Sequence, residues 1–308
     1  MVTDNPAPKK NSSQSDPPSV ADLIHRHMDE LTPAERKVAR ALLANYPVAG
    51  LEPLAEFANQ AKVSHPSVLR FVSKLGLQGY GRFQSALRAE LGARLESPLT
   101  KMHEDGVGKD VEHDTNSDFL DSFVEGVCDN IRQSVASSPR SEFEGALKLL
   151  ADTRGAVYMI GGRMTDAIAS YTYMHLRMLR PRVHHVKGTP ASWAPYLLDM
   201  DTRSVVIVFD IRRYDRDVIR FAEEAADQGA HIILVTDHWL SPIASRAEHL
   251  LASRVSAPSS WDSMAAMITF MEALIAALNN RNWDQLKNRI RMIEEIDERF
   301  ENDGQKTE

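Results

Sequence analysis

The sequence predicts an all-α helix-turn-helix headpiece followed by an α/β domain, built as three layers around a doubly wound, five-stranded parallel sheet. A length of 308 residues suits two domains of moderate size better than one large domain. Apolar residues recur at helical spacing through the first third of the chain. From residue 156 onward, short apolar runs alternate with amphipathic stretches, as in a parallel sheet covered on both faces.

The composition narrows the class of protein further. The chain is 43% apolar and 26% charged, with a net charge of −7, which is ordinary for a folded protein. It has no apolar run of about 18 residues, so we expect no membrane span. The single cysteine, Cys128, cannot form an internal disulfide and fits a reducing cytoplasm. We expect neither a cofactor nor a metal site.

The headpiece is expected over residues 20–96, after a polar, proline-rich and disordered tail at 1–19. Thr32 and Pro33 predict a helix start, and Glu35 completes a capping box with Thr32. Further helices are expected at 52–61, 64–75 and 81–95.

The helices at 52–61 and 64–75 are joined by a short turn and form the helix-turn-helix, with the second as recognition helix. Ser64 is expected to cap this second helix. Arg70 suits either a guanine edge or a phosphate, and Lys74 suits a phosphate. The candidate DNA-binding residues lie outside the apolar stripe and are Ser64, His65, Ser67, Arg70, Ser73 and Lys74.

The local charge agrees with this prediction although the whole chain is acidic. Residues 61–94 contain six Lys or Arg against one acid, Glu90, which gives a local charge of +5. A basic stripe of this kind is the electrostatic pattern of a DNA-binding domain. The residues alone also allow a plain helical bundle with a solvated basic face.

A polar linker is expected at 97–118, then the α/β domain at 119–281 and a C-terminal helix and tail at 282–308. The expected strands are the apolar runs at 156–160, 183–186, 204–209, 231–235 and 249–253. The charged C-terminal helix carries one apolar stripe, which suits either an ordinary packing face or a dimerisation seam.

Ligands of doubly wound domains bind at the carboxyl ends of the strands, near helix N-termini. Three polar loops follow strands here, at 161–165, 210–215 and 236–242. The candidate ligand-binding residues are Gly161, Gly162, Arg163, Thr165, Asp210, Arg212, Arg213, Asp237 and Ser241.

Two segments resemble the RpiR family of transcriptional regulators. The run Leu31-Thr32-Pro33-Ala34-Glu35-Arg36-Lys37-Val38-Ala39 resembles the opening of that family. Residues 62–76, followed by Gly79-Tyr80-Gly81-Arg82-Phe83, resemble its recognition helix and exit turn. The family joins this headpiece to a sugar isomerase (SIS) domain. The resemblance implies a cytoplasmic, non-enzymatic regulator that binds a double-stranded DNA operator as a homodimer or homotetramer.

The resemblance also implies a small, anionic, carbohydrate-derived or related effector, but the ligand loops depart from the family pattern. Its Gly-x-Gly-x-Ser loop reads Gly161, Arg163 and Thr165 here. Its serine and threonine cluster, which binds the sugar phosphate, is replaced by Asp210, Arg212, Arg213, Asp215 and Asp217. The third loop, with Thr236-Asp237 and Ser241-Pro242, matches well.

Three interpretations of the altered loops remain open. The arginines hold a different anion, or the Arg and Asp side chains pair internally and close the pocket, or the usual phosphosugar still binds. For the chain as a whole, a sugar-phosphate isomerase or lyase, and a DNA-binding protein whose SIS domain only oligomerises, are the alternatives.

Overall fold

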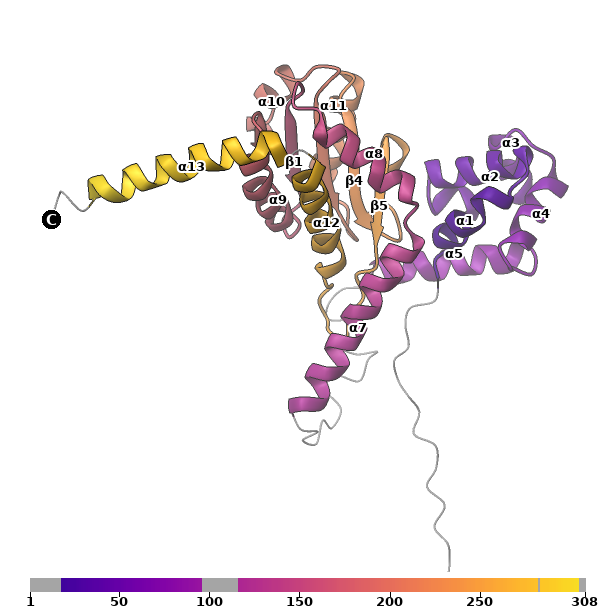
Figure 1. The fold of residues 1–308 in the computed structure, drawn as a ribbon. Helices are drawn as coiled ribbons and strands as arrows, with labels where there is room; N and C mark the ends of the chain where they lie inside the picture. The colour runs from indigo at the N-terminus through magenta and orange to yellow at the C-terminus, as the bar shows by residue number, and fades with distance from the viewer. Residues whose placement is uncertain (1–17, 96–115, 282, 305–308) are drawn as a thin grey trace, which may run out of the picture.

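The computed structural model describes residues 18–95, 116–281 and 283–304. Most of the predicted tail at 1–19 and of the predicted linker at 97–118 lies outside the described residues. Pro18 and Ser19 are described at the N-terminus, and Ser19 is buried against the headpiece. The headpiece lies to one side of the α/β domain (Figure 1).

The headpiece is helical throughout its described residues, as predicted. It contains α1 (Val20–His27), η1 (Met28–Glu30), α2 (Pro33–Ala44), η2 (Val48–Leu51), α3 (Leu54–Gln60), α4 (His65–Lys74) and α5 (Tyr80–Leu95). The capping box of α2 is confirmed, because Thr32 Oγ1 accepts from Glu35 N at 3.4 Å and Glu35 Oε2 accepts from Thr32 N at 2.9 Å. Fully buried side chains from four helices form the core: Val38, Leu42, Phe57, Phe71, Phe83 and Leu87.

The second domain begins with α7 (Asn116–Ser137) and α8 (Arg140–Ala151) and then forms the predicted sheet. Its strands are β1 (Val157–Gly161), β2 (Val183–His185), β3 (Val205–Asp210), β4 (His231–Asp237) and β5 (His249–Ser253). They lie in the order β2-β1-β3-β4-β5, and every pair is parallel. The register pairs Gly161 with Phe209 and Asp210 with Thr236, so three strands end at the same edge.

Helices cover both faces of the sheet and complete the three layers. On one face α8, α9 (Asp166–Leu179) and α12 (Ala265–Arg281) bury Leu150, Leu176 and Phe270 against the strands. On the other face α10 (Ala194–Leu198) and α11 (Arg216–Asp227) pack with Phe221 at their centre. The short helices η3 (Pro190–Ser192) and η4 (Pro242–Ser245) lie in the connecting loops.

The C-terminal helix α13 (Trp283–Gly304) extends away from the domain body (Figure 1). Its predicted apolar stripe is covered only near its start, where Leu286 is 4% exposed. Farther along, Ile296 and Phe300 are 42% and 76% exposed in the single chain. Packing within one chain therefore accounts for the first part of the stripe only.

In the part of the chain that the structure describes, none of the helices has the length and apolarity needed to cross a membrane.

Candidate functional site

The outer face of α4 is the candidate DNA-binding face. Four of the six predicted residues, Ser64, His65, Arg70 and Ser73, are exposed, as the helical pattern indicated. Ser67 is not: it is 5% exposed, and the prediction that it faces outward is wrong. Ser67 Oγ lies 3.0 Å from Ser64 Oγ and accepts from Arg70 Nη2 at 3.1 Å, so it holds that guanidinium against the helix.

The start of α4 differs from the prediction in one further respect. Ser64 has the extended backbone of an N-cap residue, but its side chain accepts no hydrogen bond from the helix backbone. The hydroxyl turns toward Ser67 instead. Side-chain capping by Ser64 is therefore a wrong prediction, and the first turn relies on Pro66 and on backbone geometry.

Lys74 is bound within the headpiece. Its ammonium donates to Glu35 Oε2 at 3.1 Å and to the carbonyl oxygen of Glu30, which ties α4 to the start of α2. Burial acts to raise the pKa of Glu35, but the hydrogen bonds from Thr32 and Lys74 together hold it below its usual value. The predicted phosphate contact of Lys74 competes with this internal pairing.

The sequence reasoning passed over Leu69, which is 40% exposed on α4. It lies four residues from both His65 and Ser73, so helical geometry puts the three on one outward stripe. An apolar side chain in the middle of a recognition helix is suited to contact a thymine methyl group in the major groove. The sequence already placed Leu69 outside the buried stripe of this helix, on the same side as His65 and Ser73.

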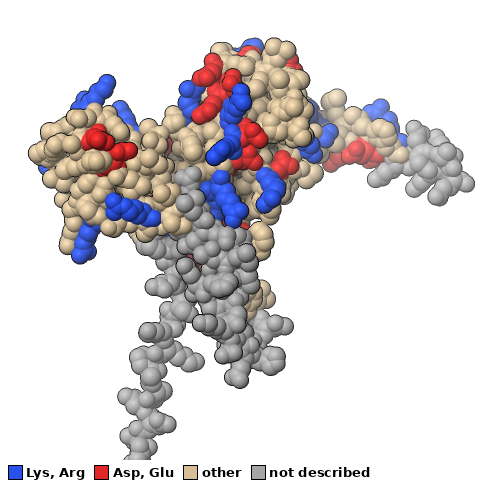
Figure 2. All heavy atoms as spheres, turned by 180° about the vertical axis from the view of Figure 1, so that it is seen from behind, with Lys and Arg blue, Asp and Glu red and all other residues tan. Residues whose placement is uncertain are grey.

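The distribution of charge separates the two domains. On the face in Figure 2, the headpiece shows several basic groups around one acidic patch, whereas acidic and basic groups alternate closely over the α/β domain. The net basic character of residues 61–94 thus belongs to the domain that carries the recognition helix, although the whole chain is acidic.

The candidate ligand loops meet at the carboxyl edge of the sheet, as predicted. Gly161 is required there, because a Cβ atom would lie 2.6 Å from Asp166 N. Thr165 does not cap α9 with its side chain. Its hydroxyl donates to the carbonyl oxygen of Phe209 at 2.7 Å and accepts from Gly162 N at 2.9 Å, which joins the first loop to the end of β3.

Asp210 is buried at the end of β3, with 2% exposure. Its carboxylate accepts from Ser241 Oγ at 2.5 Å and from Asp215 N at 3.0 Å. Burial raises the pKa of Asp210 to about 7, although these two hydrogen bonds oppose the shift. Asp215 in turn caps α11 by accepting from Asp217 N and Val218 N. The backbone N–H groups that would cradle a phosphate at this helix therefore already face a carboxylate.

Asp237, at the end of β4, is fully buried. It accepts from Tyr214 Oη at 2.7 Å, from Arg212 N at 2.5 Å and from Trp239 N at 3.1 Å. Burial raises the pKa of Asp237 to about 6, against these donors. The two carboxylates that were predicted to bind a ligand, Asp210 and Asp237, thus accept hydrogen bonds from the loops of the protein itself.

The predicted ligand residue Arg212 is 7% exposed. Its Nε donates to Asp262 Oδ2 at 2.5 Å, and its guanidinium carbon lies 4.6 Å from the ring centroid of Trp239. Arg163 and Arg213 are different: both are exposed, and neither side chain has a hydrogen-bond or ion-pair partner among the described residues. Of the three arginines at this edge, these two have exposed side chains.

The headpiece rests directly on the loop that follows β4. Leu240 of that loop is part of the headpiece core, and Ser19 Oγ donates to the carbonyl oxygen of His238 at 3.3 Å. Beside this contact, Arg254 Nη2 and Asp22 Oδ2 form an ion pair at 2.6 Å, with both residues 4% exposed. Asp237 and Leu240 lie three residues apart, so the ligand loop and the domain contact are one segment.

The structure offers no metal centre in its described parts, where no three His, Cys, Asp or Glu side chains are grouped so that they could hold an ion.

Family comparisons match both domains. The model of the rpiR-family helix-turn-helix domain matches residues 19–94, and that of the SIS domain matches residues 149–277. The protein is therefore a helix-turn-helix protein with a C-terminal SIS domain. Its helix-turn-helix domain is of the rpiR-family type, and the SIS domain follows it along the chain.

Two relatives are similar to parts of the chain. The bifunctional protein glk of Burkholderia orbicola is 26% identical over 230 residues, or 74% of this chain and 34% of that protein, so the chain spans about a third of this relative's length. The HTH-type transcriptional regulator HexR of Pseudomonas aeruginosa is 36% identical over 75 residues, or 24% of this chain and 26% of that protein.

A solved structure confirms the fold of the second domain. The sugar isomerase domain of an RpiR transcription factor from Sphaerobacter thermophilus is similar, with a TM-score of 0.53 and 19% identity. The match covers 57% of this chain and 97% of that chain.

Proposed function

We propose that the protein is a DNA-binding transcriptional regulator whose SIS domain senses a small anionic metabolite. The observation that carries this proposal is the position of the headpiece. An RpiR-type recognition helix, exposed along its outer face, belongs to a domain whose core includes Leu240 of the β4 ligand loop. A ligand that binds more tightly to one arrangement of this contact than to another shifts the balance between the arrangements.

The recognition helix supports DNA binding through its chemistry. Arg70 offers two donors to a guanine edge or to a phosphate, and His65 and Ser64 lie at the amino end of α4, where base edges are contacted. We propose that two such headpieces, in a homodimer or homotetramer, bind an operator with inverted half-sites.

The ligand loops support an anionic effector held differently from the usual phosphosugar. The N-terminus of α11 is occupied by Asp215, and Asp210 lies where the family carries hydroxyl groups. Arg163 and Arg213 remain exposed at the same edge of the sheet, and guanidinium groups suit phosphate or carboxylate. We therefore place the effector against these two side chains.

The experiment that tests DNA binding is capture of genomic fragments by the full-length protein, followed by sequencing, at several salt concentrations. A recurrent inverted repeat, with affinity that falls steeply as salt rises, supports the regulator. Fragments no more enriched than random DNA, with and without added metabolites, would overturn it.

We further propose that the SIS domain binds its metabolite without converting it. Incubation with a panel of sugar phosphates is expected to give no product, while one or more compounds raise the melting temperature. Turnover of any of them would favour the isomerase or lyase interpretation instead.

A further inference from the structure

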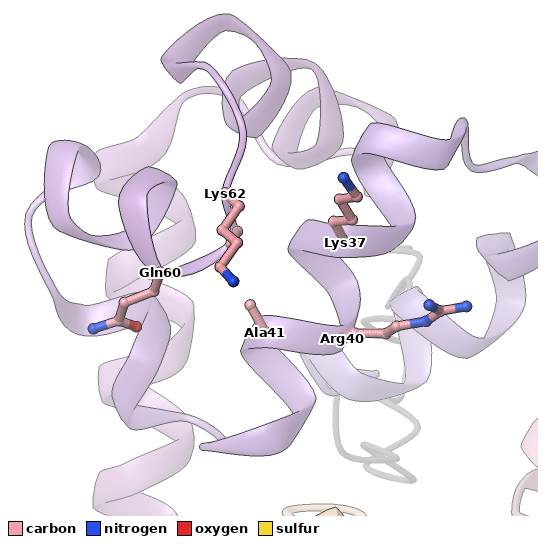
Figure 3. Close-up of a pocket in the computed structure, with 6 residues that line it drawn as sticks. Lys37, Arg40, Ala41, Gln60 and Lys62 are labelled. Carbon is pink, nitrogen blue, oxygen red and sulfur yellow. The ribbon is translucent and has the colours of Figure 1, made fainter.

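An open groove lies between α2 and the turn of the helix-turn-helix, at the amino end of α4. It measures about 360 Å³ and is lined by Lys37, Arg40, Ala41, Gln60, Ala61 and Lys62. None of these six residues is acidic. Figure 3 shows Lys62 reaching from the turn toward Ala41 on α2, with Lys37 on the same helix and Arg40 at the outer rim.

The three basic side chains of this groove are not engaged by other described residues of the protein. Lys37, Arg40 and Lys62 are exposed, and none of their side chains has a hydrogen-bond or ion-pair partner within the described ranges. Lys74, at the end of α4, forms an ion pair with Glu35 instead. The groove therefore gathers positive charge that nothing in the described chain neutralises.

The backbone at Lys62 gives an independent reason to assign it a function. Lys62 has a φ of +53°, in the left-handed region. Val63 N donates to the carbonyl oxygen of Ala58, and Lys62 N donates to that of Asn59, both at 3.0 Å. This is the helix-ending motif in which the left-handed position favours glycine. A lysine there accepts strain that a glycine would avoid.

We propose that this groove holds a backbone phosphate of DNA, with Lys62 and Lys37 as its ligands and Arg40 at its rim. The groove opens two residues before Ser64, so a phosphate in it flanks the bases that the start of α4 would contact. In this proposal, contact between the Lys62 ammonium and the phosphate is the reason why a lysine, and not a glycine, occupies the left-handed position. This inference rests on the proposed DNA-binding function and adds to it a phosphate site outside the recognition helix.

The test compares full-length wild type with Lys62→Gly on the selected operator and on a random duplex of equal length. The salt slope is the slope of the logarithm of DNA affinity against the logarithm of salt concentration. Removing one phosphate contact lowers its magnitude by about 0.9 per headpiece, which corresponds to a loss of about eightfold in affinity at 0.1 M salt. The loss is expected to be equal on both duplexes, because a phosphate contact carries no sequence information. The melting temperature is expected to stay level or rise, since glycine relieves the left-handed strain. Lys37→Gln is expected to weaken binding in the same direction.

Arg182→Gly is the matched control. Arg182 is also an exposed cation with a left-handed backbone, at φ +57°, but it lies in the α/β domain. It is expected to leave the salt slope unchanged. An unchanged slope in Lys62→Gly, a loss confined to the operator, or an equal loss in Arg182→Gly would each overturn the phosphate site while wild-type DNA binding stands.

Two further outcomes separate the sources of the anion. If inorganic phosphate raises the melting temperature of wild type but not of Lys62→Gly, and DNA affinity is the same in both, the groove is a site for a free anion and the proposal fails. If wild type binds neither duplex at low salt, the proposed function fails together with the inference.

Discussion

Replacement of Asp210 by asparagine is expected to remove a pH-dependent weakness from the α/β domain. The buried carboxyl group has a pKa of about 7, against an ordinary value of 3.8. Below pH 3.8 the carboxyl group is protonated in both the folded and the unfolded chain, so it adds no pH dependence to the free energy of unfolding. As pH rises from there toward 7, only the folded chain keeps the proton, and the free energy of unfolding falls. Above pH 7 the loss is complete.

The magnitude follows from about 1.4 kcal/mol for each unit of pKa difference. Between pH 5 and pH 8 the wild type is expected to lose about 3 kcal/mol through this carboxyl group. An asparagine can still accept from Asp215 N through its oxygen and donate to Ser241 Oγ through its nitrogen, so the loop geometry is kept. The variant should therefore lose about 3 kcal/mol less than wild type over this pH range.

Urea unfolding followed by tryptophan fluorescence measures this difference. All four tryptophans, at 193, 239, 261 and 283, lie after residue 150, so the signal reports the second domain. Asp199→Asn, at an exposed position, is the control for loss of one surface carboxylate. Parallel profiles of Asp210→Asn and wild type would refute the reasoning, because the carboxyl group would then ionise as freely as in the unfolded chain.

Three further predictions concern coupling and recognition. Asp22→Asn removes the carboxylate that Arg254 contacts at 2.6 Å, so it should loosen the headpiece by about 1–3 kcal/mol; limited proteolysis of the full-length protein measures this, and unchanged cleavage argues against this ion pair as a link between the domains. Leu69→Ala should reduce discrimination at one thymine of the operator, and replacing that thymine by uracil should cost wild type affinity but leave the variant unaffected; equal losses in both proteins would exclude the methyl contact. The double variant Arg163→Gln, Arg213→Gln should abolish the effector response with operator affinity intact, and a retained response would move the effector elsewhere.

The element order and the parallel sheet could be predicted from the sequence because their signals are local. β-branched runs, capping residues and helical spacing act over a few residues, and the capping box at Thr32 and Glu35 formed as expected. The error at Ser67 was also avoidable. It lies four residues before Phe71, so helix geometry places it at the buried stripe, and its polarity was given too much weight.

The internal pairing of the ligand loops could be stated only as an alternative. Arg212 was selected as a ligand residue, but its carboxylate partner Asp262 is 50 residues away and no local pattern announces it. The Asp22–Arg254 pair joins residues 232 positions apart. The Lys62 groove needs the packing of α2 against the turn. These features depend on tertiary contacts, which spacing along a single sequence does not report.

The shared position of Leu240 has a consequence for the operator itself. The segment that carries Asp237 at the end of β4 places Leu240, three residues later, in the headpiece core. Free energies of binding at two linked sites are reciprocal, so a metabolite that weakens DNA binding by some factor is itself bound more weakly, by the same factor, on DNA. In the proposed regulator, operator DNA would therefore act as an effector of the SIS domain. Metabolite affinity measured on the free protein would then differ from affinity measured on operator DNA, and their ratio would equal the factor by which the metabolite changes the DNA affinity.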